Sequence, residues 1–326
     1  MNDVSFLRTL PILILYPHSR CNCRCIMCDI WRAGGTQELG LEDLDRQTKD
    51  IETLGVRQIV FSGGEPLMHS DLFRLSDYVR KRGISTTILT SGLLLQENAH
   101  SIALGTDGVI VSLDGPPQVH DSIRRVPGGF QRLAAGIKAL RAERPDYPVG
   151  ARCTVQRRNH ALLRQTAEAA RGLGVQSISF LAADVTSSAF NRPAGWSAAR
   201  RSEVSLDERE TGELEAEIER LIGELPGYAG FVLETPEKLR RIGLHFRAQL
   251  GLADAVAPRC NAPWVSAVVE SDGTVRPCFF HDAIGNVRQQ ALAEVINGRR
   301  AAEFRMALDV SRDPVCRRCV CSLYLR

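Results

Sequence analysis

Short apolar runs and helical patterns alternate six times between Leu10 and Leu181 of this chain. Apolar runs of five to eight residues are typical of buried strands, and the amphipathic stretches between them are typical of helices. Strands that alternate with helices form a parallel sheet, and right-handed crossovers wrap such a sheet into a barrel. We therefore predict an α/β fold that begins with a partial (β/α)6 TIM-like barrel. The predicted strands are residues 10–16, 56–61, 84–89, 108–113, 149–155 and 175–181.

The chain changes character after the sixth predicted strand. Residues 182–201 are rich in small residues, and we expect either a loop over the barrel mouth that contacts substrate or a flexible linker. Ser205 with Glu208 three residues later predicts a capping box that opens a helix, and a second helix is expected to begin at Thr235. The predicted helices of the barrel are residues 41–54, 71–81, 94–104, 130–142 and 161–173. The predicted domains are a barrel at 1–200, a helical linker at 201–256 and a small α+β domain at 257–326.

Composition excludes several classes of protein. The chain has 326 residues, is 44% hydrophobic and carries a net charge of +3 with both signs interspersed. Such a chain buries a large core and lacks the basic stripe of a nucleic-acid binder. No apolar run approaches a membrane span, so we expect a cytoplasmic protein with neither nucleic acid nor membrane as partner. Nine of its ten cysteines lie at metal-ligand spacings, which in a reducing compartment indicates metal binding.

Three cysteines follow the first predicted strand. Cys21, Cys25 and Cys28 have a C-x3-C-x2-C spacing. A [4Fe-4S] cluster normally takes four cysteine ligands, so three on one loop would leave one iron open to a ligand from outside the protein. The alternatives are a zinc knuckle completed by Cys23 or His18, or free thiols in the core.

A glycine-rich turn follows the second predicted strand and reads Gly63, Gly64, Glu65. Glycines let a backbone approach a ligand closely, and a carboxylate complements an ammonium group. Parallel barrel strands all end at one face, so Cys21 and Glu65 are expected at the same mouth. By itself this turn is weak evidence, because glycine pairs before proline are common in turns.

Together the two motifs, in this order, resemble those of the radical S-adenosylmethionine enzymes, and the resemblance covers nearly the whole chain. It implies a [4Fe-4S] cluster held by Cys21, Cys25 and Cys28, whose free iron binds the amino and carboxylate groups of S-adenosylmethionine. The segment from Gly63 to Glu65 would hold the methionine amino group. Reductive cleavage of this cofactor would give a 5'-deoxyadenosyl radical that removes a hydrogen atom from substrate. The chain departs from the usual pattern at Cys23, where an apolar residue is usual, and at Met27, where an aromatic residue is frequent.

The resemblance also implies cofactor contacts at the ends of the third and fourth strands. Thr90, Ser91 and Ser112 occupy these positions, with turn capping as the alternative reading. In the fifth strand Arg152 is expected to face the barrel lumen and to pair with the cofactor carboxylate. Cys153 faces the other way, so we weigh a role as hydrogen-atom donor against a buried core thiol.

A second set of cysteines lies toward the C-terminal end of the chain. A predicted hairpin at 266–270 and 274–277 leads into Cys278, and the set suits either zinc or a second [4Fe-4S] cluster. The region resembles the SPASM and twitch extensions of radical S-adenosylmethionine enzymes, and the shorter twitch form implies one auxiliary [4Fe-4S] cluster. The ligands it implies are Cys260, Cys278, Cys316 and Cys319, with Cys321 as the alternative to Cys319.

The resemblance implies an oxidoreductase-type enzyme that receives electrons from a flavodoxin- or ferredoxin-type donor. Because the cysteines begin at position 21, we expect no peptide-recognition domain ahead of the barrel. This favours oxidation, epimerisation or rearrangement of a small-molecule natural-product intermediate. A maturase that modifies a ribosomal peptide is the alternative, and a non-catalytic zinc-binding interaction protein is the second.

Overall fold

The computed structural model describes residues 6–193 and 195–326. In this part of the chain one nine-stranded sheet has the order β6-β5-β4-β3-β2-β1-β7-β8-β9. The neighbouring pairs from β1 to β6 are all parallel, which confirms the six predicted barrel strands. The strands are β1 Ile12–Leu15, β2 Gln58–Phe61, β3 Ser85–Thr90, β4 Gly108–Ser112, β5 Val149–Val155, β6 Ser177–Ala182, β7 Ser266–Val269, β8 Thr274–Arg276 and β9 Gly285–Asn286.

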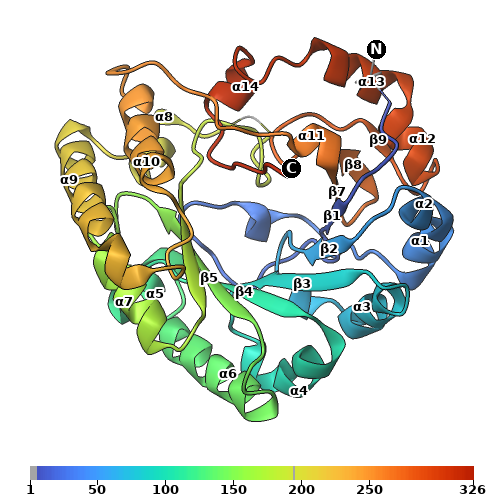
Figure 1. The fold of residues 1–326 in the computed structure, drawn as a ribbon, viewed down its shortest axis with the longest axis horizontal. Coiled ribbons are helices and arrows are strands. Elements are labelled where there is room, and N and C mark those ends of the chain that lie inside the picture. Colours follow the sequence, from blue (N-terminus) through green and yellow to red (C-terminus); the bar gives the residue numbers. More distant parts are fainter. Residues whose placement is uncertain (1–5, 194) are drawn as a thin grey trace.

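Helices cover the outer face of the curved sheet (Figure 1). The five helices predicted for the barrel are present, and the first of them is divided into α1 and α2. No helix in the described ranges combines the length and the apolar character needed to cross a membrane. The helices are α1 Leu41–Arg46, α2 Thr48–Thr53, α3 Leu72–Arg80, α4 Leu95–Gly105, α5 Pro117–Arg124, α6 Gly129–Glu143, α7 Leu163–Gly172, α8 Ala198–Ser202, α9 Glu208–Glu224, α10 Pro236–Gln249, α11 Ala262–Val265, α12 Leu292–Asn297, α13 Arg299–Ala307 and α14 Pro314–Arg317. Short 3-10 turns are η1 Ile30–Arg32, η2 Pro66–Met68 and η3 Leu225–Tyr228.

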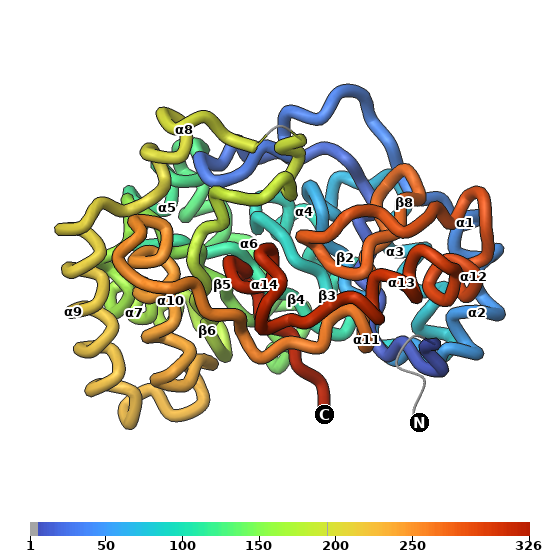
Figure 2. The backbone as a smooth tube through the Cα atoms, turned by 90° about the horizontal axis from the view of Figure 1, so that it is seen from above, coloured from blue at the N-terminus to red at the C-terminus, as the bar shows by residue number. Residues whose placement is uncertain are grey.

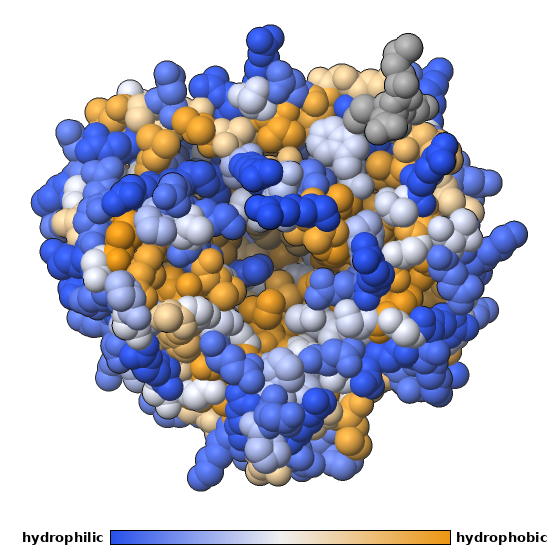
Figure 3. All heavy atoms as spheres, in the orientation of Figure 1, coloured by the Kyte–Doolittle hydropathy of each residue, from blue (hydrophilic) through white to orange (hydrophobic). Residues whose placement is uncertain are grey.

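The two faces of the barrel strands differ in what they pack against. In β5, Val149, Ala151, Cys153 and Val155 are buried among the outer helices, whereas Arg152 points the other way. This alternation follows from the two-residue period of a strand. The inward residues line a cavity of about 470 Å³, which we call the lumen cavity. Figure 3 shows a hollow near the middle of this face of the molecule.

The C-terminal region extends the barrel sheet. Strand β7 pairs in parallel with β1, with Ile12 opposite Ser266 and Leu15 opposite Val269. The predicted hairpin is present, because β7 and β8 pair in antiparallel fashion. The predicted domain boundaries stay a prediction, but hydrogen bonds of one continuous sheet join the first strand of the barrel to the C-terminal region.

The predicted capping box at Ser205 is wrong. Asp207 caps α9, since its carboxylate accepts from the backbone nitrogen of Glu210 while the Glu210 side chain accepts from the Asp207 nitrogen. Ser205 instead donates its hydroxyl to Gln249 in α10. The capping pattern exists twice, two residues apart, and Asp is as good an N-cap as Ser.

Helices α5 and α8 are among those that the sequence did not predict. Residues 114–116, which follow β4, lead directly into α5, which has Pro117 in its first turn. The loop 182–201 ends in α8, whose N-cap Ser197 accepts from the backbone nitrogen of Arg200. Both helices are shorter than nine residues, so neither shows a long amphipathic repeat in the sequence.

Glycine at position 136 permits the close packing of α4 against α6. A Cβ atom there would lie 2.4 Å from the Leu95 Cβ. We expect Gly136→Ala to lower the free energy of unfolding by about 1–3 kcal/mol, because overpacking outweighs the better helix propensity of alanine. Gly212 in α9 has open space around it, so Gly212→Ala is the matched control and should raise stability by about 0.5–1 kcal/mol. Urea unfolding followed by circular dichroism measures both, and equal effects would contradict the packing argument.

Candidate active site at the mouth of the barrel

The segment that follows β1, residues 17–29, carries the first three cysteines and is called the cluster loop here. Its backbone is held by the last turn of α5: the Arg24 nitrogen donates to the Arg124 carbonyl (3.3 Å) and the Ile26 nitrogen to the Ile123 carbonyl (3.0 Å). The last carbonyls of a helix have no partner within the helix, so they are free to accept these bonds. The cluster loop therefore has a fixed backbone path across the barrel mouth.

Two nitrogen donors point at the sulfurs of the cluster loop. The Ile30 backbone nitrogen lies 3.5 Å from the Cys28 Sγ, and Arg124 Nη1 lies 3.6 Å from the Cys25 Sγ. Arg124 is in turn paired with the fully buried Asp114 at 2.6 Å. Burial raises the pKa of the Cys28 thiol to about 12. Because metals bind the thiolate, a bound cluster has to supply the positive charge that keeps this sulfur deprotonated.

The extra thiol of the cluster loop is buried. Cys23 is 2% exposed and packs with Ile26 and Met27 in a small apolar cluster. Its thiol contacts those of Cys21 and Cys25, and the hydrogen bond with Cys21 is the main cause that raises the pKa of Cys23 to about 12. Met27 therefore fills apolar space under the loop, as expected for an adaptable thioether.

The glycine turn lies directly on the cluster loop. A Cβ on Gly64 would be 2.0 Å from the carbonyl oxygen of Arg20, and one on Gly63 would be 2.5 Å from the ring of Tyr16. Gly63 also has a φ of +94°, which side chains rarely tolerate. The Glu65 nitrogen then donates to the same Arg20 carbonyl at 2.8 Å. Only glycine fits both positions, and the fit brings the two motifs together.

The carboxylate of Glu65 is fully buried and accepts four hydrogen bonds from the chain. Oε1 accepts from the Thr90 hydroxyl (2.7 Å) and the Leu67 nitrogen (3.1 Å). Oε2 accepts from the backbone nitrogen (2.8 Å) and the hydroxyl (2.6 Å) of Ser91. Burial raises the pKa of Glu65, while these donors act in the opposite direction. The sequence analysis predicted Glu65, Thr90 and Ser91 as separate contacts of the cofactor. In the structure the three side chains belong to one hydrogen-bond network.

The remaining predicted site residues lie on both sides of the barrel wall. Ser112 is the half-buried last residue of β4. Arg152 faces the lumen cavity, and its Nε donates to the Ser179 hydroxyl at 3.3 Å. Cys153 is 1% exposed within the main core, and the Asn159 amide nitrogen lies 3.5 Å from its sulfur. Cys153 thus occupies the apolar outer face of β5, and its role as hydrogen-atom donor stays a prediction.

The described part of the loop 182–201 lies against the cluster loop. Trp196 Nε1 donates to the Asp29 carboxylate (2.5 Å), Asn191 donates to the Asp29 carbonyl (3.1 Å), and Arg200 donates to the Ile26 carbonyl (2.6 Å). Figure 2 shows the α8 segment beside the blue cluster loop. A cavity of about 450 Å³, the mouth cavity, opens between this loop, the glycine turn and the C-terminal region. This placement favours the substrate-contact interpretation of the loop over the flexible linker.

The C-terminal cysteines converge on one small cavity of about 70 Å³, called the auxiliary cavity. The last residues of the chain are drawn in by Asn261, whose backbone nitrogen donates to the Leu323 carbonyl at 2.8 Å. Burial raises the pKa of Cys278 to about 11 and that of Cys316 to about 12. The cysteines that line the cavity are Cys260, Cys278, Cys316, Cys319 and Cys321.

The spacing of ligand atoms separates zinc from an iron-sulfur cluster. Four thiolates around one zinc lie about 3.8 Å apart, given Zn–S bonds of about 2.3 Å in a tetrahedron. Among the described residues, the group of three or more ligand atoms that meets a mutual distance of 4.8 Å is His281, Asp313 and Cys316, and neither cysteine set forms such a group. In a cubane each thiolate binds a different iron, so its cysteines need not lie within that distance of one another.

Arg124 is the residue of this site that sequence reasoning missed, because α5 was not predicted. Pro117 in the first turn and a basic residue in the last turn are the signals that indicate this helix. The contacts of Asp29 with Trp196 were also missed, and no local pattern indicates them because they join residues 167 positions apart.

Comparison with protein families agrees with this geometry. The family described as the Radical SAM superfamily matches residues 15–186, and the family described as an iron-sulfur cluster-binding domain, SPASM, matches residues 260–320. The first match covers the barrel with the cluster loop, and the second covers the C-terminal cysteines up to Cys319. Together they confirm S-adenosylmethionine and [4Fe-4S] clusters as cofactors. These matches do not support the alternative hypothesis of a non-catalytic zinc-binding interaction protein.

Several known proteins are similar to this chain. An AdoMet-dependent heme synthase of Methanosarcina barkeri is 26% identical over 294 residues, which cover 84% of this chain and 78% of that protein. A PqqA peptide cyclase of Ruegeria pomeroyi is 27% identical over 272 residues, which cover 81% of this chain and 66% of that protein. Among solved structures, Streptococcus suis SuiB bound to S-adenosylmethionine has a TM-score of 0.70 at 14% identity, covering 98% of this chain and 74% of that chain. The likeness confirms the predicted barrel fold. The chain belongs to the Radical SAM superfamily and carries a C-terminal SPASM-type cluster-binding domain.

Proposed function

We propose that this enzyme oxidises a substrate held in the lumen cavity, after a hydrogen atom has been removed from it at the barrel mouth. One observation carries the proposal: the lumen and auxiliary cavities share a wall made of Ile14, Phe279, Cys321 and Leu323. A substrate in the lumen therefore lies next to the site of the predicted auxiliary cluster, which is the position needed to accept an electron. Oxidation is favoured over epimerisation because Cys153, the donor considered for the latter, lies in the core.

The side chains of the site act as a scaffold in this proposal. When bound, the cluster and S-adenosylmethionine supply a one-electron reduction and a carbon radical that amino-acid side chains cannot generate. Cys21, Cys25 and Cys28 hold the cluster. The Glu65 carboxylate already accepts four hydrogen bonds from the chain, so the backbone of Gly63 and Gly64 would hold the cofactor. Glu65 therefore holds the turn in place, and we infer that backbone carbonyls receive the methionine ammonium.

The volume of the lumen cavity supports a small-molecule substrate. This volume of about 470 Å³ lies within the range of about 300–1,000 Å³ typical of small-molecule sites. The heme synthase among the relatives is named for a small-molecule product. An electron donor of the flavodoxin or ferredoxin type completes the proposal.

A peptide substrate is the second candidate, and the mouth cavity favours it. That cavity adds about 450 Å³ next to the lumen, lined by Phe190, Asn191 and Phe280, which gives an extended chain room to leave the barrel. One relative is named as a peptide cyclase, and one structural neighbour was solved with its precursor peptide. Product analysis with a candidate small molecule and a candidate peptide separates the two.

The two cysteine sets have different roles in S-adenosylmethionine cleavage. We expect Cys25→Ala to abolish release of 5'-deoxyadenosine from dithionite-reduced, anaerobically reconstituted enzyme, because it removes a ligand of the catalytic cluster. Cys316→Ala should lose the iron and the visible absorption of the auxiliary cluster, but it should still cleave S-adenosylmethionine. The measurement is 5'-deoxyadenosine by mass spectrometry together with iron analysis. Equal loss of cleavage in both variants would show that the roles are misassigned.

The buried Glu65 network gives a separate prediction. Glu65→Gln keeps the shape but replaces one acceptor oxygen by an NH2 group that faces a chain donor. We expect a loss of about 1–3 kcal/mol in the free energy of unfolding, the usual cost of an unsatisfied buried polar group, and weaker binding of S-adenosylmethionine. The matched control is Glu97→Gln on the exposed face of α4. Urea unfolding and calorimetric titration with the cofactor measure both effects, and a Glu65→Gln variant that behaves like the control would refute the anchoring role.

A further inference from the structure

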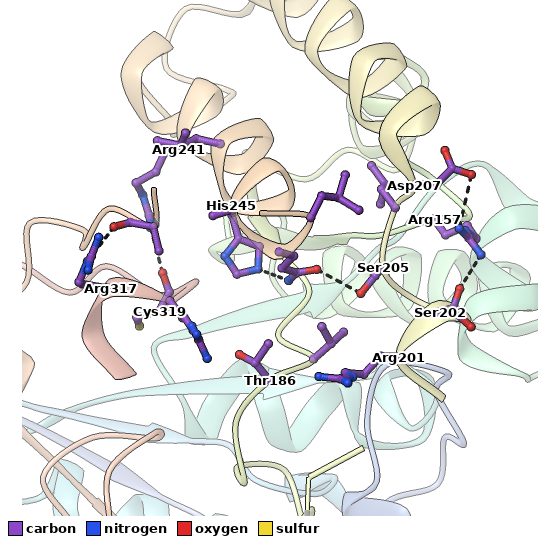
Figure 4. A pocket seen from close by; sticks show the side chains of 18 of the residues that line it. Arg157, Thr186, Arg201, Ser202, Ser205, Asp207, Arg241, His245, Arg317 and Cys319 are labelled. Atoms are coloured by element: carbon purple, nitrogen blue, oxygen red, sulfur yellow. Dashed lines mark hydrogen bonds and ion pairs between the residues drawn. The ribbon is translucent and has the colours of Figure 1, made fainter. Parts of the chain in front are cut away.

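A second large cavity lies outside the barrel lumen. It has a volume of about 530 Å³ and is formed by α8, the start of α9, α10 and the segment around α14 (Figure 4). We call it the arginine cavity, because one carboxylate, that of Asp207, stands among five guanidinium groups in its lining. These belong to Arg157, Arg201, Arg241, Arg317 and Arg318.

Carboxylates balance only a small part of this positive charge. Arg157 is neutralised by Glu210 at 2.9 Å. The other four have no ion pair with a carboxylate within the described part of the chain: Arg241 donates to the Cys319 carbonyl at 2.9 Å and Arg317 to the Ala255 carbonyl at 2.9 Å. The whole chain has a net charge of only +3. The sulfurs of Cys260, Cys319 and Cys321 act on Arg241, so the local excess of positive charge that attracts anions is carried by Arg201, Arg317 and Arg318.

The wall between these arginines is mostly apolar. His245 adds no charge to it, because burial lowers its pKa to about 4. Figure 4 shows His245 on α10 linked through Gln249 to Ser205 rather than directed at a charged partner. The apolar residues of the lining include Val185, Leu206, Leu244, Ala248 and Val256. A cavity with an apolar wall and guanidinium groups at its rim matches a ligand that is apolar in its body and acidic at an end.

The arginine cavity touches both functional regions of the enzyme. Cys319 lines it and also lines the auxiliary cavity. Arg241 and His245 line it and also line the lumen cavity. A ligand bound here contacts the residues that separate it from substrate and from the auxiliary cysteines.

We propose that the arginine cavity is a binding site for an amphiphilic carboxylate, with Arg201 and Arg318 pairing with its acidic group. Guanidinium groups bind carboxylates in a planar, two-bond geometry, and within the described ranges neither of these two has an ion pair that competes. The same chemistry is offered by a small amphiphilic acid and by a peptide segment with glutamates beside leucines. Binding here is independent of S-adenosylmethionine cleavage.

The test is calorimetric titration of the anaerobically reconstituted protein with two probes. One is decanoate, and the other is an N-acetylated, C-amidated tetrapeptide of two leucines flanked by glutamates. The charge controls are decyltrimethylammonium and the same tetrapeptide with glutamines. We expect at least one acidic probe to bind and its control to fail, and the probe that binds identifies the source of the carboxylate.

Variants locate the binding. The double variant Arg201→Glu with Arg318→Glu should weaken binding of the acidic probe about tenfold, equivalent to about 1.4 kcal/mol. Ala248→Trp should also weaken binding, because the larger side chain occupies space in the cavity. The matched control is Arg8→Glu with Arg57→Glu, two exposed arginines that change the net charge equally. The proposal is overturned if neither acidic probe binds. It is also overturned if the Arg201→Glu with Arg318→Glu variant binds the probe as tightly as the control variant does.

Discussion

The contact between the glycine turn and the cluster loop is the constraint on which this site depends. The Arg20 carbonyl occupies the space that a side chain on Gly64 would need, and it accepts a hydrogen bond from the Glu65 nitrogen. Two backbone segments that follow different strands are thereby fixed at van der Waals distance. The cysteines and the turn keep one relative position because no side chain separates them.

A buried ion pair extends this arrangement across the mouth. Asp114 follows β4, and its carboxylate holds the Arg124 guanidinium that also reaches the Cys25 sulfur. The same carboxylate accepts from the Thr154 nitrogen of β5. One acidic group therefore links two strands, α5 and a predicted cluster ligand, and its burial is tolerable because every part of it has a partner.

The sequence predicted the strands well, because strands depend on local patterns. Runs such as 149–155 coincide with the observed strand, and the twofold period placed Arg152 and Cys153 on opposite faces. The features that the sequence did not indicate depend on contacts between distant residues or on short elements. The role of Glu65 arises from donors 25 and 26 residues away, and the capping error at Ser205 arose because Asp207 offers the same pattern two residues later. Helix α5 was missed because eight residues are too few for a period to show.

Strand β1 has neighbours on both sides, and they come from distant parts of the chain. One edge pairs with β2, the next strand in sequence, whereas the other edge pairs with β7, which follows all six strands of the barrel. During synthesis that second edge stays unpaired until most of the polypeptide has emerged from the ribosome. Unpaired strand edges recruit other chains, and contacts of such sequence separation form slowly. Maturation of this protein in the cell thus includes a long interval in which strand β1 is vulnerable to misassembly.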